Sequence, residues 1–377
     1  MHIGVLKETS PGERRVALVP ESSKKLIQLG YSITVEAGAG ESAGFPDSAY
    51  RESGAAVESD PEAVLQASDL VLKVNPPVRR NGRHEVDWMR PGSVYLGSLM
   101  PLRNLEAVRL LADHRFTAFA TDAIPRTTRA QSMDTLSSMA NIAGYKGALL
   151  AATELNKYFP MLMTAAGTVP PAKVFVIGAG VAGLQAIATA RRLGANVFAT
   201  DVRPEVKEQI ESVGAKYVGI ELGESAAAGG GYAKELSEAD RKRQSELLAA
   251  QVTQSDAVIT TALIGGVFAP RLISAAMVRS MRPGSVIVDL AADGGGNCEL
   301  SRPGETVIEG GVTILAPLNL AATMPLHASL LFSRNLTAFV QAFTKDKAFQ
   351  LDLTDDIQQG AVITHEGSVK HQRTQEA

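Results

Sequence analysis

The sequence predicts an α/β protein of two doubly wound, parallel-sheet domains with a cleft between them. Two observations lead to this prediction. Residues 2–120 alternate between strand-length apolar runs and helix-length segments, and that alternation favours a parallel sheet with helices on both faces. A second alternating series starts at Lys173 and contains the spacing G-x-G-x-x-G between a strand and a helix, which is typical of Rossmann-like domains.

The first domain is expected to begin with a strand and to continue through alternating helices and strands. Pro20 favours the start of a helix over 20–29 and Gly30 favours its end, because proline fits the first helical turn and glycine the position after the last. The glycine-rich stretch 37–45 and the polar stretch 75–92 are expected to be loops. Expected strands cover 2–7, 32–36, 69–74, 93–98 and 116–120, and expected helices cover 20–29, 61–67 and 102–113.

A long helix over 135–157 is expected to connect the two domains. A helix pattern over 322–345 then returns the chain to the first domain, so that 1–139 plus 325–377 form one domain and 140–324 the other. The polar tail from about residue 350 is expected to be frayed. In the second domain, expected strands cover 174–177, 196–200, 215–218, 256–260 and 285–290, and expected helices cover 181–193, 204–213, 238–253 and 270–280.

The glycine motif at 178–183 carries the clearest chemical signal. Gly178 permits a tight turn, Gly180 lets the backbone approach a pyrophosphate, and Gly183 lets the helix pack closely on the strand. Free N–H groups and the helix dipole then hold the phosphates. Asp201 ends the second strand, at a position suited to a carboxylate that binds the ribose 2′-hydroxyl. A carboxylate there repels a 2′-phosphate, so the motif favours NAD(H) over NADP(H).

Composition excludes several classes of partner. The 377 residues carry a net charge of −3, so no overall positive field favours nucleic acid or an anionic membrane. Cys298 is the only cysteine, which excludes an intrachain disulfide and favours a cytosolic protein. No histidine pair has metal-ligand spacing, so no metal site is predicted. No apolar run is long enough for direct membrane insertion.

Two further stretches are candidates for contact with a ligand. Residues 124–145 read IPRTTRAQSMDTLSSMANIAGY and crowd hydrogen-bonding side chains in front of an apolar helix. Asp134 can simply cap that helix, or the stretch can be a loop at the cleft that contacts a bound ring. The glycine- and alanine-rich insertion 221–238 contains one aromatic residue, Tyr232, and is either a lid or a surface loop without a role.

At this point the sequence resembles a known family. The stretches PRTTRAQSMDTLSSMANIAGYKGAL, GTVPPAKVFVIGAGVAGLQA, DVRPEVKEQIESVGAKYV, GGYAKE, TTALIGG and SVIVDLAADGGGNCE are similar to the NAD(H)-binding α subunit, domain I, of proton-translocating nicotinamide nucleotide transhydrogenase. The resemblance runs from Met1 to about residue 345, and the loop around Gln131 is its most specific part. The same superfamily includes alanine dehydrogenase, which shares the opening GVLKE…ERRVAL.

The resemblance implies roles for individual residues. Arg126, Gln131, Asp134 and Ser137 match the family's loop near the nicotinamide. Gln131 would hydrogen-bond toward the nicotinamide region and the partner nucleotide, Asp134 would pair with Arg126, and Ser137 would hold the nicotinamide end. Tyr232 matches a mobile-loop tyrosine that closes over the nucleotide, and Asp201 matches the acid at the adenosine ribose. The predicted contacts with NAD(H) are Gly178, Ala179, Gly180, Val181, Gly183, Asp201, Val202, Arg203, Tyr232, Thr261, Ala262 and Leu263.

The resemblance also implies an activity and partners. Family members transfer hydride directly from NADH to NADP+ on another subunit, as a Re/Si-specific NAD(P)+ transhydrogenase that works only with its partner subunits. They are homodimers that dock on an NADP(H)-binding β subunit and on a separate membrane-spanning proton channel. A cytoplasmic protein that is peripheral on the inner face of the cell membrane is therefore expected.

Two alternatives stay open. Alanine dehydrogenase must move a proton as well as a hydride, and its relatives carry a histidine where this sequence has Met100. Arg15, Lys73 and Asp293 nevertheless match residues of that enzyme's site, and their other explanation is ancestry with local salt bridges. Hydride transfer between two nicotinamides needs only positioning and exclusion of water, which suits the loop around Gln131. The second alternative is a non-catalytic NAD(H)-binding regulator.

Overall fold

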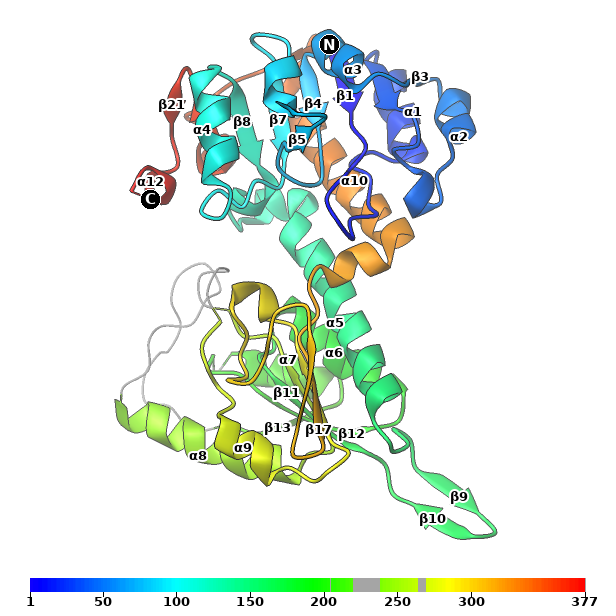
Figure 1. Cartoon of the computed structure of the whole chain (residues 1–377), viewed down its shortest axis with the longest axis vertical. Coiled ribbons are helices and arrows are strands. Elements are labelled where there is room, and N and C mark those ends of the chain that lie inside the picture. The colour runs from blue at the N-terminus through cyan, green and yellow to red at the C-terminus, as the bar shows by residue number, and fades with distance from the viewer. Residues whose placement is uncertain (204, 220–237, 264–268, 377) are drawn as a thin grey trace. The chain divides into compact units, whose positions relative to one another are not determined.

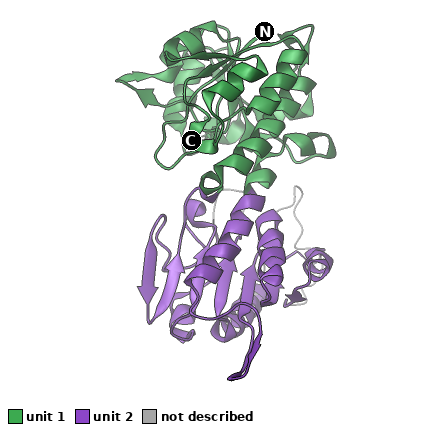
Figure 2. Cartoon of the chain, turned by 90° about the vertical axis from the view of Figure 1, so that its right-hand side faces the viewer, with its two compact units in different colours: residues 1–139, 321–377 green, residues 140–320 purple. Residues whose placement is uncertain are grey.

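The computed structural model describes residues 1–203, 205–219, 238–263 and 269–376. These residues form two compact units, coloured separately in Figure 2. Unit 1 comprises Met1–Met139 and Ala321–Ala377, and unit 2 comprises Ala140–Leu320. Each unit contains a mainly parallel sheet, which confirms the predicted fold class. No helix within the described residues is long and apolar enough to cross a membrane.

The sheet of unit 1 has eight strands in the order β21-β20-β8-β7-β4-β1-β2-β3. Strands β1 to β8 of this sheet pair in parallel, and the order reverses direction at β1 and β4, as in a doubly wound fold. The strands are β1 (His2–Val5), β2 (Ser32–Glu36), β3 (Ala56–Glu58), β4 (Leu70–Leu72), β7 (Val94–Gly97), β8 (Thr117–Ala120), β20 (Val362–His365) and β21 (Ser368–Val369). The helices are α1 (Pro20–Gln28), α2 (Asp47–Ser53), α3 (Pro61–Ala67), α4 (Leu105–Asp113), α10 (Pro325–Ala342), α11 (Asp356–Ala361) and α12 (Gln372–Gln375).

The C-terminal tail is ordered, so the prediction of a frayed tail is wrong. Strand β20 adds to the sheet antiparallel to β8, and β21 then pairs antiparallel with β20. Ile363 is fully buried, and Thr364 Oγ1 donates a hydrogen bond to Phe116 O at 2.9 Å. The tail is polar in composition, but Val362, Ile363 and Thr364 of β20 are all buried. Pairing of β20 with β8 also satisfies backbone groups that would otherwise be unpaired at the edge of the sheet.

Helix α10 returns the chain to unit 1 and supplies part of its core. Phe332, Leu336 and Phe339 of α10 belong to the same buried cluster as residues of β1 and β2. Two serines on α10 also complete the backbone hydrogen bonding of an N-terminal segment, because Ser329 Oγ accepts from Val16 N and Ser333 Oγ accepts from Val19 N, each at 3.0 Å. Unit 1 is therefore built from both ends of the sequence.

The sheet of unit 2 has seven strands in the order β13-β12-β11-β14-β15-β17-β16. All neighbours are parallel except β16 and β17. The strands are β11 (Lys173–Ile177), β12 (Asn196–Thr200), β13 (Lys216–Tyr217), β14 (Ala257–Thr260), β15 (Val286–Asp289), β16 (Thr306–Glu309) and β17 (Val312–Leu315). The helices are α6 (Val181–Arg192), α7 (Val206–Ser212), α8 (Glu238–Gln254) and α9 (Ala275–Ser280). The order reverses direction at β11 and β14, which is where ligands bind in such sheets.

Three short hairpins and one long helix complete the architecture. Helix α5 (Thr135–Glu154) begins in unit 1 and continues in unit 2. Gly144 packs so closely on α6 that a Cβ there would lie 2.0 Å from Ala182 O. Figure 1 shows the hairpin β9 (Leu162–Thr164) and β10 (Gly167–Val169) extending from unit 2. Unit 1 carries the hairpins β5 (Arg79–Arg80) with β6 (Arg83–His84) and β18 (Thr344–Lys345) with β19 (Ala348–Phe349).

Some element boundaries differ from the sequence prediction. The expected helix 270–280 is helical only from Ala275, because Leu272 N and Ile273 N donate to Asn297 O and Ser274 caps the helix. The expected loop 75–92 contains the hairpin β5–β6. The hairpin β16–β17 and helix α2 were not expected. Gly310 and Gly311 have φ of 58° and 82°, which are the values that a tight hairpin turn requires.

Candidate functional site

The glycine turn of unit 2 lies between β11 and α6, at the carboxyl end of the sheet. Gly178 has φ of 91°, a backbone conformation that residues other than glycine rarely adopt. A Cβ on Gly183 would lie 1.9 Å from Gly178 O, whereas a Cβ on Gly180 would meet nothing within 4 Å. The first and third glycines are therefore required by the protein itself. The space beside Gly180 is free, as backbone that approaches a pyrophosphate needs.

Asp201 follows β12 and is held by its neighbours. Its Oδ2 accepts hydrogen bonds from Ala179 N at 2.8 Å and Arg203 Nη2 at 2.9 Å. Its Oδ1 accepts from Arg203 N at 3.0 Å and Arg203 Nε at 2.9 Å. Burial raises the pKa of the Asp201 carboxyl, but the bonds from Arg203 and Ala179 outweigh burial and leave that pKa below its ordinary value. Asp201 is therefore an ionised acceptor attached to the glycine turn.

The segment Thr261–Leu263 follows β14 and lies against the same turn. Thr261 Oγ1 donates to Gly178 O at 3.0 Å. A Cβ on Gly178 would lie 2.7 Å from Thr261 Oγ1 and 3.2 Å from Ala262 N. Leu263 and Val181 expose apolar side chains, and Val202 is half-buried between Asp201 and Arg203. The structure thus brings together the predicted contacts Gly178 to Gly183, Asp201 to Arg203 and Thr261 to Leu263. Tyr232 lies outside the described residues.

Two buried polar residues of unit 2 were not identified from the sequence. Asn297 and Asp289 are both fully buried. Asn297 hydrogen-bonds both backbone groups of Ala262, and Asp289 accepts from Thr260 Oγ1 at the end of β14. The signal for Asp289 was its place as the last residue of an apolar strand, where a polar side chain reaches the carboxyl edge of the sheet. The signal for Asn297 was weaker, because it stands among glycines in a loop.

In unit 1, the predicted residues Arg126, Gln131, Asp134 and Ser137 lie on one segment that contains a 3-10 helix (Thr128–Met133) and the first turn of α5. Asp134 Oδ1 accepts from Ser137 N at 2.8 Å, and Oδ2 accepts from Ser137 Oγ at 2.6 Å. This is helix-capping geometry, so the structural interpretation of Asp134 holds whatever further role it has. Gln131 and Arg126 lie at exposed positions of the segment.

Three contacts with more C-terminal parts of the chain hold this segment. Asn335 Nδ2 on α10 donates to Ser132 O at 2.8 Å. Arg129 forms an ion pair with Asp355 at 2.6 Å and with Asp356, at the start of α11. The ordered tail therefore supports the segment that carries Gln131, a contact that the expectation of a frayed tail had excluded.

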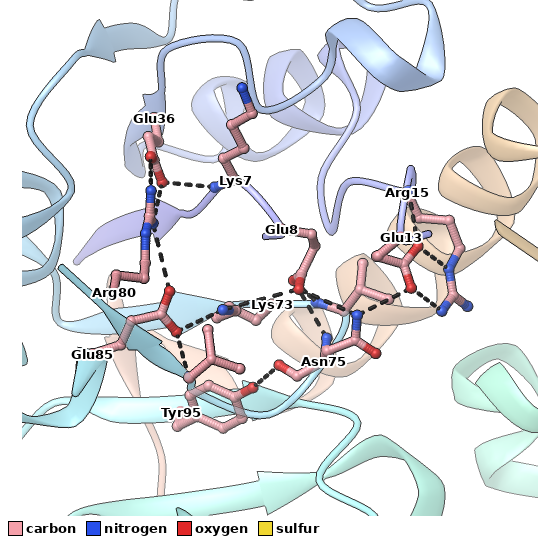
Figure 3. A network of polar contacts seen from close by, with 12 residues as sticks. Lys7, Glu8, Glu13, Arg15, Glu36, Lys73, Asn75, Arg80, Glu85 and Tyr95 are labelled. Carbon is pink, nitrogen blue, oxygen red and sulfur yellow. Dashed lines mark hydrogen bonds and ion pairs between the residues drawn. The ribbon is translucent and has the colours of Figure 1, made fainter. Parts of the chain in front are cut away.

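A buried ion network occupies the carboxyl ends of β1, β2 and β4 in unit 1 (Figure 3). Lys73 Nζ lies 2.6 Å from Glu85 Oε2 and 3.9 Å from Glu8 Oε2. Arg80 pairs with Glu36 at 2.5 Å and with Glu85 at 3.5 Å. Burial lowers the pKa of the Lys73 ammonium, but Glu8 and Glu85 raise it above its ordinary value. Burial raises the pKa of the Glu8 carboxyl, and Lys73 only partly offsets that rise.

Arg15 extends the same network at its outer end. Arg15 Nε and Nη2 donate to the two carboxylate oxygens of Glu13 at 2.8 Å and 2.6 Å. Asn75 Nδ2 donates to both Glu13 and Glu8, and Tyr95 OH donates to Asn75 O at 2.6 Å. The two cations that could bind a carboxylate substrate, Arg15 and Lys73, are thus paired with carboxylates of the chain.

Met100 follows β7 in a strained backbone conformation. Its φ is 41° and its side chain is exposed. The Asp122 carboxylate fixes this turn by accepting from Leu99 N at 2.8 Å, Met100 N at 2.9 Å and Ser98 Oγ at 3.0 Å. Burial raises the pKa of Asp122 despite these bonds. Among the described residues, no group of three or more histidine, cysteine or acidic side chains could hold a metal ion.

Comparisons with known proteins agree with this geometry. The family model for the N-terminal domain of alanine dehydrogenase/PNT matches residues 4–143, and that for the C-terminal domain matches residues 147–372. The chain is 46% identical over 376 residues to the first portion of the NAD(P) transhydrogenase alpha subunit of Rhodospirillum rubrum, with 98% of each protein covered. It also matches the solved transhydrogenase from Sinorhizobium meliloti, at 44% identity and a TM-score of 0.88 over 98% of this chain and 100% of that one. A solved L-alanine dehydrogenase matches at 26% identity and a TM-score of 0.82, over 100% of this chain and 98% of that one.

Proposed function

The chain belongs to the alanine dehydrogenase/PNT family, and from that premise we propose that it is the NAD(H)-binding α subunit of NAD(P)+ transhydrogenase. One observation carries the choice between the family's two activities. Unit 2 offers an unobstructed glycine turn with an ionised Asp201, while Arg15 and Lys73 of unit 1 are already paired with Glu13, Glu8 and Glu85. The glycine turn serves either activity, whereas the pairing of Arg15 and Lys73 with carboxylates of the chain disfavours a carboxylate substrate.

Direct hydride transfer requires the chain mainly to position the bound nucleotide. NADH supplies the hydride when bound, and NADP+ on a partner subunit accepts it. Gly178 to Gly183 and Thr261 to Leu263 hold the nucleotide through backbone groups, with Asp201 at its adenosine ribose. Gln131, together with Arg126 and Ser137, orients the nicotinamide end. Met100 has no proton to transfer, and direct hydride transfer needs none.

The proposal extends to assembly and location. We assign the chain to a Re/Si-specific enzyme that is active only with its partners. It forms a homodimer that docks on an NADP(H)-binding β subunit, and a separate membrane-spanning subunit couples the reaction to proton translocation. The protein is then cytoplasmic and peripheral on the inner face of the cell membrane.

Assays on the isolated chain separate this function from its alternatives. Mixed with NADH, pyruvate and ammonia, the chain should give no turnover, and brisk oxidation of NADH would establish alanine dehydrogenase instead. Mixed with an NADP(H)-binding partner domain, it should exchange hydride between the two nucleotides. If it binds NADH but exchanges no hydride at saturating nucleotide, it is a regulator.

Gln131→Asn tests the positioning role. The shorter amide should slow hydride transfer at least about tenfold while NADH affinity changes little, because it misplaces the ring rather than weakening binding. Thr128→Ser, an exposed position on the same segment, is the matched control. A large loss of affinity with an unchanged transfer rate would contradict the assignment.

Asp201→Asn tests the ribose contact. The amide keeps the size of the carboxylate but weakens acceptance from Arg203 and from a ribose hydroxyl, so NADH should bind about tenfold more weakly. Calorimetry with NADH measures the change. Unchanged affinity would disprove the contact.

A further inference from the structure

Asn297 forms hydrogen bonds with the backbone of Thr261–Leu263, the segment that is predicted to contact the nucleotide. Its Oδ1 accepts a hydrogen bond from Ala262 N at 3.0 Å. Its Nδ2 donates to Ala262 O at 2.8 Å and to Pro270 O at 2.9 Å. One side chain therefore pairs with both backbone groups of Ala262, as a neighbouring strand would at a position where the sheet has ended.

Ala262 packs directly against the glycine turn. The preceding residue, Thr261, donates through Oγ1 to Gly178 O at 3.0 Å. Gly178 approaches Ala262 so closely that an added Cβ would lie 3.2 Å from Ala262 N and 3.4 Å from its Cα. A shift of Ala262 would therefore change the space available at the turn.

Asp289 fixes the loop that carries Asn297. Its Oδ2 accepts from Cys298 N at 3.0 Å and Ser301 Oγ at 2.6 Å. Its Oδ1 accepts from Thr260 Oγ1 at 2.9 Å and Ala291 N at 3.1 Å. Asp289 and Asn297 are both fully buried. The carboxyl ends of β14 and β15 are thus joined through Asp289, and Asn297 is held in place beside Ala262.

We infer that Asn297 is a positioning residue for dinucleotide binding, which holds Thr261–Leu263 against the glycine turn without itself touching the nucleotide. This inference rests on the proposed NAD(H)-binding function of unit 2. The side chain is suited to the task because an amide has one acceptor and two donors, and all of its three contacts here use them in the matching sense.

Asn297→Asp is the sharpest variant, because it keeps size and shape. One carboxylate oxygen still accepts from Ala262 N, but the other replaces Nδ2 and faces Ala262 O and Pro270 O, two acceptors to which it cannot donate. NADH should bind about tenfold more weakly. Asn297→Ala should weaken binding in the same direction by removing all three bonds.

Phe159→Leu is the matched control for general loss of stability. Phe159 is buried, and its carbonyl accepts from Ala172 N at 3.1 Å directly before β11 begins. It therefore lies at the other end of β11 from the glycine turn. This variant should lower the melting temperature of the protein while leaving the dissociation constant for NADH within about twofold of the unmodified value.

Two measurements on the full chain decide the inference. The first is the dissociation constant for NADH by fluorescence titration. The second is amide hydrogen exchange of Ala262 without nucleotide, which should accelerate in Asn297→Ala, because the acceptor of this amide is removed, but not in Phe159→Leu. The inference is overturned if Asn297→Asp binds NADH as the unmodified chain does, or loses no more affinity than Phe159→Leu. If the unmodified chain itself fails to bind NADH, the proposed function falls as well, which distinguishes the two failures.

Discussion

The carboxyl edges of the two sheets begin from the same topology and are completed by different chemistry. In unit 1, side chains that follow β1, β2 and β4 close the edge with alternating carboxylates and cations, from Glu36 through Lys73 to Glu8. In unit 2, the corresponding edge consists of a glycine turn, backbone amides, the pair of Asp201 with Arg203, and the buried Asp289. The charged groups of the first edge pair with one another, whereas the second edge leaves space beside Gly180.

The difference shows how one fold can carry both a closed and an open edge. Charged side chains can neutralise each other within the protein, which leaves little affinity for a charged ligand. Backbone N–H groups at a helix start have no internal partner, so they remain available to an anion. The predictions below test whether unit 1 is indeed a structural edge and unit 2 a binding edge.

Lys73→Met should have the largest effect and should be confined to unit 1. It removes the cation beside the buried Glu8 and the nearer of two cations beside Glu85, which keeps Arg80 at 3.5 Å. Removing one partner of a buried ion pair typically costs about 3–5 kcal/mol. Trp88 is the only tryptophan and is buried in unit 1, so urea unfolding followed by its fluorescence reports this unit. Any surviving folded protein should bind NADH with unchanged affinity, and a loss of affinity would count against a purely structural edge.

Lys73→Met combined with Glu85→Gln provides the control. The second change removes the carboxylate that lies 2.6 Å from Lys73 Nζ, so less uncompensated charge remains and some of the lost stability should return. Stability no better than that of the single variant would mean that size and packing at Lys73, rather than charge, dominate the effect.

Gly183→Ala should destabilise unit 2 by about 3 kcal/mol or more, because overpacking against backbone is seldom relieved. The new Cβ would lie 1.9 Å from Gly178 O, and neither atom belongs to a flexible side chain. Hydrogen exchange of β11 and α6 measures the loss, and Trp88 fluorescence should show unit 1 intact. Normal protection of β11 in this variant would refute the close packing.

Gly180→Ala should leave the fold almost unchanged and reduce NADH affinity at least about tenfold, since the methyl group occupies space that a pyrophosphate needs. The backbone is extended at this position, with φ of −73° and ψ of −165°, so alanine fits without strain. Thermal unfolding and an NADH titration on the same sample separate the two effects. Full affinity would mean that unit 2 does not bind phosphate at this turn.

The pH dependence should have opposite signs in the two units and is the smallest effect. Asp201 has a lowered pKa, so its contribution is present above the ordinary value of 3.8 and is lost as pH falls through the folded value. Glu8 has a raised pKa, so unit 1 loses stability as pH rises above the ordinary value of 4.5 through the folded one. Asp122, with a raised pKa, and His2, His84 and His371, with lowered pKa values, also contribute to the profile of unit 1. The contribution of Glu8 is therefore the difference between the unmodified chain and Glu8→Gln in urea unfolding from pH 4 to 8, followed by Trp88 fluorescence, and this difference should fall as pH rises.

An identical dependence of stability on pH in both units would contradict the opposite slopes predicted for Asp201 and Glu8. For unit 2, hydrogen exchange of β11 and β12 below pH 5, corrected for intrinsic rates, measures the contribution of Asp201. Asp201→Asn should remove the loss of protection at low pH while leaving the slope of unit 1 unaltered.

The regions of the fold that the sequence predicted are those with local signals. Helix 61–67 and strands 32–36 and 196–200 have the predicted limits, because proline, glycine and apolar runs define them locally. The glycine turn was equally predictable from the sequence, since three glycines and a terminal acidic residue occur in a fixed order. These features depend on a few neighbouring residues and little on tertiary contacts.

The features that the sequence did not reveal depend on distant partners. Nothing local indicates that Thr364 would bond to Phe116 O, 248 positions earlier, and so the tail was expected to fray. The bonds of Asn297 to Ala262, 35 positions away, were equally hidden. Asp201 was identified, but its attachment to Arg203 was not, because the sequence does not show which way the Arg203 side chain turns.

The return of α10 to unit 1 has a consequence for the order in which the protein forms on the ribosome. Val16 and Val19 find their partners Ser329 and Ser333 more than 300 residues later. Unit 2 is continuous in sequence from Ala140 to Leu320, so it can complete its sheet first. At about 5–20 residues per second, its synthesis takes roughly 10–40 s. During that interval the nascent segment 1–139 exposes the surface that Phe332 and Phe339 later cover, and this is when chaperones have most to bind.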